Sequence, residues 1–504
     1  MDVFGSKLVE ALSVYHASWL LGLSVTVAVA IAIKMSSNQK SRSPLHRKFS
    51  FTSVGMAIGI FPESVKAPTT IINAAIYFST CPAEKDLIEL AVKPMLAFTR
   101  LSTIPVPETA NCRPSTRSFA PSELIRKVEI SGKCIKSTND VIFKHLQESL
   151  STERDDLPWW EFLVVENVGE GESAVVLRMH HALADGISLV HVFEKFITYE
   201  DGSPVLSIIL SNMAQKSKVE KTHKTNPFRL AWMLVRDATK VLTLGLSRSD
   251  DPTIFTEPNQ TYVHSQHREC VVFPTFSLAF VKRLKTAANV TVNDILMTAV
   301  SQAVHEYCRA ESCSVLMGKG ASLQSRALLP IALPRSASDL EHPSTALRNK
   351  WCLVSANMSI GCVDLVDRLN SIHQTTVHLK GSPIAMVQLS LQNKLASRLP
   401  KIVARQTMLD IFRRHSLVFS NVPGPDRPCQ LAGQTATGVQ MFYSNLIPQV
   451  GLLSYAGNIY GNIVLDTGAV PNAESLAGHY AKALVDMATL LNVDKIPTNL
   501  QSYF

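Results

Sequence analysis

The sequence predicts an α/β protein with two lobes. Strand-like and helical segments alternate along the chain, which is the pattern expected when helices cover the faces of sheets. At 504 residues the chain is longer than one hydrophobic core usually supports, so two lobes are the starting expectation. Hydrophobic residues make up 46% of the chain and charged residues only 18%, which predicts a folded rather than a disordered protein.

The chain divides into four predicted segments. Residues 1–50 form a membrane anchor with a basic flank, and residues 51–200 form the N-terminal lobe. An uneven, partly polar stretch at 201–262 connects the lobes, and residues 263–504 form the C-terminal lobe.

An uncharged apolar segment, Ala17 to Ile33, lies near the start of the chain. Its 17 residues reach the lower limit for a helix that crosses a bilayer. Basic residues mainly follow the segment, which argues against a cleavable signal peptide and, by the positive-inside rule, places the lobes in the cytosol. We expect a single-pass protein of the endoplasmic reticulum or the plasma membrane. A cleaved signal and a helix buried in the protein are the alternatives.

The charge and the cysteine content limit which partners and metal sites the protein can have. The net charge of +8 comes from Lys and Arg scattered through both halves, without a basic stripe or zinc-finger spacing. We therefore expect no nucleic-acid partner, because this charge suits membrane lipid and acidic substrates instead. The nine cysteines are odd in number, widely spread and contain no Cys-x-x-Cys pair, which predicts reduced thiols and neither a disulfide framework nor a metal site.

The most informative motif follows a predicted β-hairpin. Residues 159–168 and 174–179 are rich in aromatic and β-branched types on either side of a Gly-rich turn. The second strand ends at the two histidines of the run His180 to Gly186, and apolar residues then recur at helical spacing over 187–197. The run is therefore a loop between a strand and a helix.

Two histidines, an aspartate and a glycine have fixed places in this run. Neighbouring residues on a strand point to opposite faces, so only one histidine can face a reaction centre. We assign His181 as the general base that removes a proton from a hydroxyl group, and His180 as a supporting residue. Asp185 holds the loop or the imidazole in place, and Gly186 permits the backbone conformation needed where the loop joins the helix.

Two further motifs admit a structural and a functional interpretation. Thr291 precedes a predicted helix, so Asn293 and Asp294 either belong to its cap or take part in catalysis. The run Ser420 to Pro425 follows an apolar strand, and its Pro-Gly-Pro ending is strong turn chemistry that could serve folding alone.

One aromatic and one amphipathic segment also allow both a structural and a functional interpretation. Trp159 and Trp160 are more often core anchors than ligands. The apolar and basic residues of 227–246 would suit a helix that lies on a membrane beside the entrance for a lipid substrate. Packing against a lobe is the commoner fate of such a helix.

The pattern His-His-x-x-x-Asp-Gly resembles the coenzyme A-dependent acyltransferase superfamily, which includes chloramphenicol acetyltransferase, carnitine acyltransferases, plant BAHD enzymes and peptide-synthetase condensation domains. Three further matches resemble the wax ester synthase/diacylglycerol acyltransferase family: Pro158-Trp159-Trp160, Asn293-Asp294 and the run Ser420 to Pro425. Leu329 to Leu333 and Arg348 to Lys350 also fall in the order expected of that family. Trp159 departs from the family's Pro-Leu-Trp element, and the sequence has no Asp-Phe-Gly-Trp-Gly of a BAHD enzyme.

The resemblance implies two lobes of the chloramphenicol-acetyltransferase type around a central channel, with His181 at its centre. A long-chain acyl group would move from acyl-CoA, the co-substrate, onto a fatty alcohol or diacylglycerol, without a metal or a permanently bound cofactor. Asn421 could donate a hydrogen bond to the thioester oxygen or to coenzyme A, and Asn293 and Gly186 are the other candidates for contact with coenzyme A. The alternatives are a non-catalytic, membrane-tethered lipid or acyl-CoA binding protein and an acyltransferase of the superfamily with another alcohol acceptor.

Overall fold

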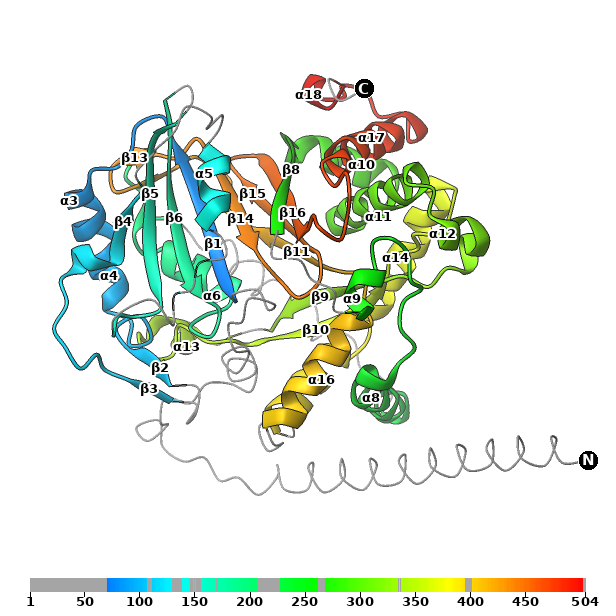
Figure 1. Cartoon of the computed structure of the whole chain (residues 1–504), viewed down its shortest axis with the longest axis horizontal. Helices are drawn as coiled ribbons and strands as arrows, with labels where there is room; N and C mark the ends of the chain where they lie inside the picture. Colours follow the sequence, from blue (N-terminus) through cyan, green and yellow to red (C-terminus); the bar gives the residue numbers. More distant parts are fainter. Residues whose placement is uncertain are drawn as a thin grey trace, which may run out of the picture.

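Two β-sheets, each with its own helices, form the two lobes of the molecule (Figure 1). The predicted membrane span at Ala17 to Ile33 lies outside the described residues, and within those residues no helix is both long and apolar enough to cross a bilayer. The computed structural model describes residues 70–106, 111–128, 138–145, 156–168, 171–205, 227–261, 268–333, 337–394 and 401–501, with the single positions 148, 150 and 335.

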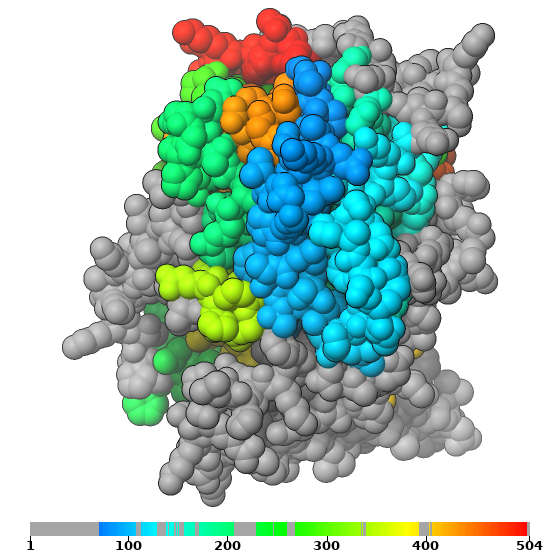
Figure 2. All heavy atoms as spheres, turned by 90° about the vertical axis from the view of Figure 1, so that its left-hand side faces the viewer, coloured from blue at the N-terminus to red at the C-terminus, as the bar shows by residue number. Residues whose placement is uncertain are grey.

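The first lobe is built on a five-stranded sheet with the order β14-β1-β6-β5-β4. The predicted hairpin forms its centre, because β5 and β6 are antiparallel neighbours. Figure 2 views the molecule from the side of this lobe, and the early part of the chain, in blue and cyan, forms the middle of that face. The strands span Gly438–Tyr443 (β14), Ile71–Phe78 (β1), Glu172–His180 (β6), Trp160–Val168 (β5) and Ile125–Lys127 (β4).

Strand alternation divides the hairpin between two apolar clusters. Phe162 and Val164 of β5 pack in one cluster with residues of the short helical segments α3 (Glu84–Leu87), η2 (Ile88–Val92) and α4 (Lys93–Leu96). Leu163 and Val165 point to the opposite face and pack in another cluster with residues of α5 (Thr138–His145). Both faces of this sheet are therefore covered. This explains why the sequences of both hairpin strands are apolar at most positions.

The second lobe is built on a six-stranded sheet with the order β10-β9-β11-β15-β16-β8. Helices α10 (Leu278–Ala287), α11 (Val292–Ala310), α14 (Leu365–Lys380) and α17 (Ser475–Leu490) contribute to the large apolar core of this lobe. The strands span Trp351–Asn357 (β10), Arg326–Ala332 (β9), Leu417–Pro423 (β11), Gln449–Tyr455 (β15), Asn458–Asp466 (β16) and Arg268–Ser277 (β8).

One strand of the C-terminal segment belongs to the first sheet. Strand β14 pairs with β1, whereas the next strand along the chain, β15, lies in the second sheet between β11 and β16. The chain thus crosses from one sheet to the other at 438–455, seen in orange at the centre of Figure 1. The predicted division at residue 263 did not anticipate this shared strand.

The predicted hairpin, the helix after Thr291 and the strand that leads into Ser420 are confirmed, and one predicted helix is shorter than expected. Helix α6 (Gly186–Phe193) ends earlier than the predicted helix over 187–197. Ile197 instead begins the short strand β7 (Ile197–Tyr199), which pairs with β12 (Cys429–Leu431). A tertiary strand pairing therefore overrides the helical spacing of the apolar residues. The amphipathic stretch at 227–246 forms helix α8 (Pro227–Leu242), followed by the short η4 (Leu244–Leu246).

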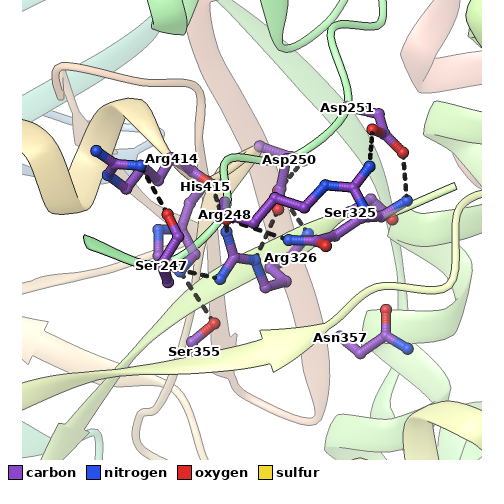
Figure 3. Close-up of polar contacts among 12 residues, drawn as sticks. Ser247, Arg248, Asp250, Asp251, Ser325, Arg326, Ser355, Asn357, Arg414 and His415 are labelled. Atoms are coloured by element: carbon purple, nitrogen blue, oxygen red, sulfur yellow. Dashed lines mark hydrogen bonds and ion pairs between the residues drawn. The ribbon is translucent and has the colours of Figure 1, made fainter. Parts of the chain in front are cut away.

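The end of the connection between the lobes is fastened to the second sheet by charged side chains (Figure 3). Asp250 accepts hydrogen bonds from the backbone N–H and Nε of Arg326, each at 2.7 Å, and from Ser416 Oγ at 2.7 Å. Asp251 accepts a hydrogen bond from the backbone N–H of Gln324 at 2.8 Å. We call Asp250, Asp251 and Arg326 the linker clasp. It holds the chain that follows α8 and η4 against the starts of β9 and β11.

Candidate active site

His181 lies directly after β6, at the place where the two sheets face each other. Its backbone N–H donates a hydrogen bond to the carbonyl of Thr70 at 2.8 Å, just before β1 begins. On the other side of β1, Ile72 is paired with Tyr443 of β14. The shared strand therefore brings the ring of Tyr443 next to His181, with centroids 5.4 Å apart and planes at 77°.

A cavity of about 230 Å³ opens beside His181 and is lined by residues of both sheets. The first lobe contributes Ile72, Met441 and Tyr443 to its walls. The second lobe contributes Leu353 and Val418, and helix α16 (Lys401–Arg413) adds Met408 and Phe412. A mostly apolar cavity with a few polar groups is the usual form of a binding site for a small organic ligand.

Asn349 fixes which ring nitrogen of His181 can act as a base. Its Nδ2 donates hydrogen bonds to the carbonyls of His181 at 2.9 Å and Ala182 at 3.0 Å, so its Oδ1 is the acceptor end. That oxygen lies 3.2 Å from Nδ1 of His181 and also accepts a hydrogen bond from Nε1 of Trp351 at 3.1 Å. An amide oxygen cannot donate, so Nδ1 of His181 carries the proton and Nε2 keeps its lone pair.

The charge state of His181 suits the same role. Burial lowers the pKa of His181 below its ordinary value, and it outweighs the hydrogen bonds and the charge of Asp185, which act in the opposite direction. A general base must be neutral at the working pH before it can take a proton. His181 therefore combines a free basic nitrogen with a neutral ring.

His180 is enclosed in the first lobe and does not line the cavity. Its Nδ1 accepts a hydrogen bond from the backbone N–H of Ala182 at 3.2 Å, and its Nε2 lies 2.9 Å from Oγ1 of Thr70. The ring packs edge-on against Trp159, with centroids 4.9 Å apart. Burial, together with the neighbouring His181, lowers the pKa of His180 to about 3. Both ring nitrogens of His180 thus serve the structure of the loop.

Asp185 joins the loop to the second lobe. Its Oδ1 caps helix α6 by accepting the backbone N–H of Ser188 at 2.8 Å. Its Oδ2 accepts the backbone N–H of Lys350 at 2.8 Å and forms an ion pair with Arg335, whose side chain is only 2% exposed. Arg335 lies outside every motif found in the sequence, and only the ion pair reveals its role.

The expectation for Gly186 was wrong. Gly186 begins helix α6 and does not have the positive φ that would demand glycine. An added Cβ would lie 4.0 Å from Cγ2 of Val422, which is an ordinary contact. The helix starts at this residue because Asp185 caps it, so the loop needs no unusual backbone here. Gly186 does line the cavity, as its proposed contact with coenzyme A requires.

The structure brings together Asn421 and Asn293, which are 128 residues apart in the sequence. Nδ2 of Asn421, on β11, donates a hydrogen bond to Oδ1 of Asn293, on the first turn of α11, at 2.6 Å. Asn421 lines the cavity beside His181, whereas Asn293 supports it from outside the lining.

Asp294 caps helix α11 and faces the core. It accepts the backbone N–H of Thr291 at 2.9 Å and hydrogen bonds from Thr376 at 2.7 Å and His373 at 2.8 Å. Burial alone would raise the pKa of Asp294, but these hydrogen bonds outweigh it and lower the pKa. The capping interpretation of this motif is therefore confirmed for Asp294.

The Pro-Gly-Pro ending of the run Ser420 to Pro425 has a steric cause. A Cβ added at Gly424 would lie 2.4 Å from the backbone oxygen of Ser454, on the neighbouring strand β15. Only glycine allows the end of β11 to approach that strand so closely. Gly424 therefore fixes the strand that carries Asn421 to the cavity.

Two family models match the chain in the regions that form this site. The model of the wax ester synthase/diacylglycerol acyltransferase catalytic domain matches residues 146–296, and the model of the WS/DGAT C-terminal domain matches residues 348–488. The chain belongs to the wax ester synthase/diacylglycerol acyltransferase family. The first match contains the run His180 to Gly186, and the second contains Asn349 and Asn421.

The individual relatives and the solved structures that the chain resembles agree with this family assignment. The chain is 22% identical over 372 residues to the probable diacylglycerol O-acyltransferase tgs1 of Mycobacterium tuberculosis, covering 71% of this chain and 77% of that protein. It is 23% identical over 357 residues to tgs2 of the same organism, covering 67% and 75%. The fold matches the wax ester synthase/diacylglycerol acyltransferase of Marinobacter aquaeolei VT8 with a TM-score of 0.55 at 14% identity, covering 88% of this chain and all of that one. It also matches the first condensation domain of the CDA synthetase, with a TM-score of 0.54 at 12% identity and coverage of 90% and 97%. The predicted α/β fold with two lobes is confirmed.

Proposed function

We propose that this chain is an acyl-CoA-dependent O-acyltransferase that transfers a long-chain acyl group to a fatty alcohol or to diacylglycerol. The observation that carries the proposal is the histidine pair: His181 lines an apolar cavity with a free Nε2, while His180 is committed to the loop. The names of the relatives, which are diacylglycerol O-acyltransferases, support the same reaction class.

The reaction follows from the state of His181. Nε2 takes the proton of the acceptor hydroxyl while that oxygen forms a bond to the thioester carbonyl carbon. The tetrahedral intermediate then breaks its carbon–sulfur bond, and the imidazolium returns the proton to the departing thiolate. Asn349 accepts the Nδ1–H throughout, so it keeps the ring oriented while its charge changes.

The negative charge on the carbonyl oxygen needs a hydrogen-bond donor in the cavity. Asn421 supplies one amide hydrogen to Asn293, and its second amide hydrogen is the donor that we assign to the thioester oxygen or to coenzyme A. Gly186 would lie close to the acyl-CoA for lack of a side chain. No permanently bound cofactor enters this scheme, and acyl-CoA is a co-substrate.

The decisive assay follows free CoA and the ester product from the purified chain. Long-chain acyl-CoA is offered with hexadecanol and with diacylglycerol in parallel, beside a short-chain alcohol that tests for a different acceptor. We expect ester formation with at least one of the two lipids and a loss of about 10²-fold or more in His181→Ala, the range for removal of a general base. His180→Ala should keep more activity than His181→Ala when both variants are compared at temperatures where they are folded.

Two outcomes would support other functions. Tight binding of acyl-CoA without any release of CoA would favour the non-catalytic binding protein. Turnover with the short-chain alcohol alone would favour an acyltransferase of the superfamily with another acceptor.

We also propose that the segment Ala17 to Ile33 anchors the chain in the endoplasmic reticulum or the plasma membrane, with the lobes in the cytosol. The support is the missing charge within the segment and the basic residues that follow it. Protease treatment of intact microsomes should degrade the lobes if this is correct. Lobes that resist the protease and carry glycans would contradict the cytosolic assignment.

A further inference from the structure

Helix α8 exposes several large apolar side chains, and Trp232 and Val235 among them share one side. Trp232 is 68% exposed and Val235 is 55% exposed, and Leu230 and Leu234 are each 42% exposed. Positions 232 and 235 are one helical turn apart, so their side chains lie on the same face. The helix lies at the edge of the second lobe, at the lower right of Figure 1.

The buried positions of α8 combine one charged and one apolar residue. Among the described positions of the helix, the buried residues are Asp237 and Ala238. Asp237 bonds to Arg236 at 2.8 Å and to the hydroxyl of Ser382, just before helix α15 (Ile384–Lys394). A surface helix normally turns its apolar side to the core and its polar side to water. Helix α8 departs from this pattern, because Asp237 is buried while Trp232 and Val235 are exposed.

A second cavity borders the buried Asp237. It has a volume of about 570 Å³ and lies between α8, α14 and α15. Its walls carry hydroxyl groups from several elements, among them Thr243, Ser355, Ser371 and Thr375. Asp237, Lys240 and Val241 of α8 line this cavity, so they lie away from the outer side of the helix, where Trp232 and Val235 remain exposed to water.

The charges on α8 indicate what covers the outer side. Arg229 is exposed near the start of the helix. Lys240 is exposed near its end, where it also lines the second cavity, and the acidic residue among the described positions, Asp237, is buried. A helix with exposed apolar and basic side chains binds at the boundary between anionic headgroups and acyl chains. Tryptophan is enriched at that boundary, because its ring is apolar and its N–H can stay hydrated.

The size of the face also favours a membrane over a second copy of the chain. The 16 residues of α8 extend about 24 Å, and at a width of about 10 Å the face covers roughly 240 Å². A stable protein interface buries about 800 Å² on each partner. A lipid surface has no such threshold, since affinity grows with each inserted side chain.

Neighbouring elements also expose large apolar side chains, and the chain after α8 is held in place. Leu246 of η4 is 69% exposed, Met386 of α15 is 69% exposed, and Val403 of α16 is 46% exposed. The linker clasp begins shortly after η4, so the end of α8 is fixed to the second sheet rather than free to swing. A fixed helix can present Trp232 and Val235 together.

We propose that α8 is an interfacial helix that docks the second lobe on a lipid surface containing anionic lipid, with Trp232 and Val235 inserted below the headgroups. The proposal goes beyond the proposed reaction, because it concerns where the lobes lie and not what they catalyse. It also differs from an anchor at Ala17 to Ile33, because docking through α8 brings the lobe itself into contact with the lipid that contains its substrates.

The first test measures contact directly in the full chain. Vesicles of phosphatidylcholine and phosphatidylserine carry bromine on the acyl chains, which quenches nearby tryptophan. The chain has five tryptophans, so the native chain is compared with Trp232→Phe, and their difference reports Trp232 alone. We expect that difference signal to be quenched, and to recover when phosphatidylserine is left out. A difference signal that bromine does not change overturns the proposal.

The second test separates docking from catalysis. Trp232→Glu/Val235→Glu should lower turnover of vesicle-borne diacylglycerol at least tenfold and leave turnover of a soluble short-chain alcohol and acyl-CoA unchanged. The matched control is Met317→Glu/Leu490→Glu, on α12 (Ser314–Lys319) and α17, where the native side chains are 70% and 54% exposed. It should change neither rate.

The other possible outcomes also test the proposal. Unchanged vesicle turnover in the α8 double variant overturns the proposal, and so does a change from dimer to monomer with vesicle binding intact. If the double variant does not fold, Trp232→Gln replaces it with the same expectation in a milder form. A native chain that acylates no acceptor contradicts the proposed function, while bromine quenching still tests docking independently.

Discussion

At the scale of single residues, the proposed chemistry depends on the side-chain amide of Asn349, which neither gives nor takes the transferred proton. Asn349 is fixed by its two hydrogen bonds to the loop carbonyls, so its oxygen must face Nδ1 of His181. The tautomer of the imidazole therefore follows from the backbone of the loop itself. A histidine held in this way needs no carboxylate to act as a base.

Replacing Asn349 should cost activity without removing the base. Asn349→Ala leaves Nδ1–H of His181 without its acceptor, so the ring can rotate or take the other tautomer, and we expect kcat to fall roughly 10- to 100-fold, less than the loss from removing the base itself. The measurement is kcat at saturating acyl-CoA, with thermal unfolding as the control for folding. An active variant with native kcat would show that Asn349 does not orient the ring.

The pH profile should report the burial of His181. The active form is neutral, so activity is complete above the pKa of His181 and is lost as the pH falls through it. Because burial lowers this pKa, the acid limb of kcat/KM should have its midpoint below the ordinary value of 6.5. Asn349→Asp should move the midpoint to higher pH, since a carboxylate beside Nδ1 favours the imidazolium. A native midpoint above 6.5 would contradict the assigned environment.

The same residues show what sequence can and cannot reveal. Strand alternation was enough to predict that only one of two adjacent histidines faces the cavity, because that rule is local. Asn349 and Arg335 contact the motif from about 150 residues or more away in sequence. The run Arg348 to Lys350 could be singled out by its resemblance to the family, but the contact of Asn349 with His181 could not be predicted. Arg335 lies in no motif, so only the folded structure reveals either contact.

At the scale of elements, glycines divide into those that the packing requires and those that it merely tolerates. Gly424 lies where the end of β11 approaches the backbone of Ser454, and Gly186 begins α6 in ordinary conformation. The sequence motifs contain both glycines and do not distinguish them. The distance from a Cβ added at each glycine to its nearest atom distinguishes the two.

A matched pair of substitutions tests this distinction. Gly424→Ala places Cβ 2.4 Å from a backbone oxygen, so the strands must separate, and we expect the free energy of unfolding to fall by about 1–3 kcal/mol. Gly186→Ala meets only Val422 at 4.0 Å, so it should change stability by less than about 0.5 kcal/mol. Chemical denaturation of both variants provides the comparison. Equal losses would mean that the close approach at Gly424 relaxes freely.

At the scale of the whole molecule, the two lobes share backbone hydrogen bonds through β14. Nδ2 of the buried Asn73, on β1, also donates to the carbonyl of Phe442 at 3.3 Å, across 369 residues of sequence. No strand was predicted at 438–443, because an isolated strand of this length gains its stability from a partner that the local sequence does not name. The two-lobed class could be predicted, whereas the strand that joins the lobes could not.

The shared strand predicts that the lobes unfold together. Loss of the second sheet would pull β15 away and leave β14 without its continuation, and this would expose Tyr443 and the cluster around Phe442 in the first lobe. Leu296→Ala, in the core of the second lobe, should therefore lower protection of slow amides in β5 of the first lobe as much as in α11.

Hydrogen exchange under conditions that report global opening measures both sites in one experiment. Val363→Ala, at a position that is 78% exposed, is the control and should change neither site. If Leu296→Ala lowers protection in α11 and leaves β5 unchanged, the lobes open independently, and β14 must then be able to stay with the first sheet while β15 detaches. Equal losses at both sites would mean that β14 couples the lobes, so a defect in either core disturbs the cavity between them.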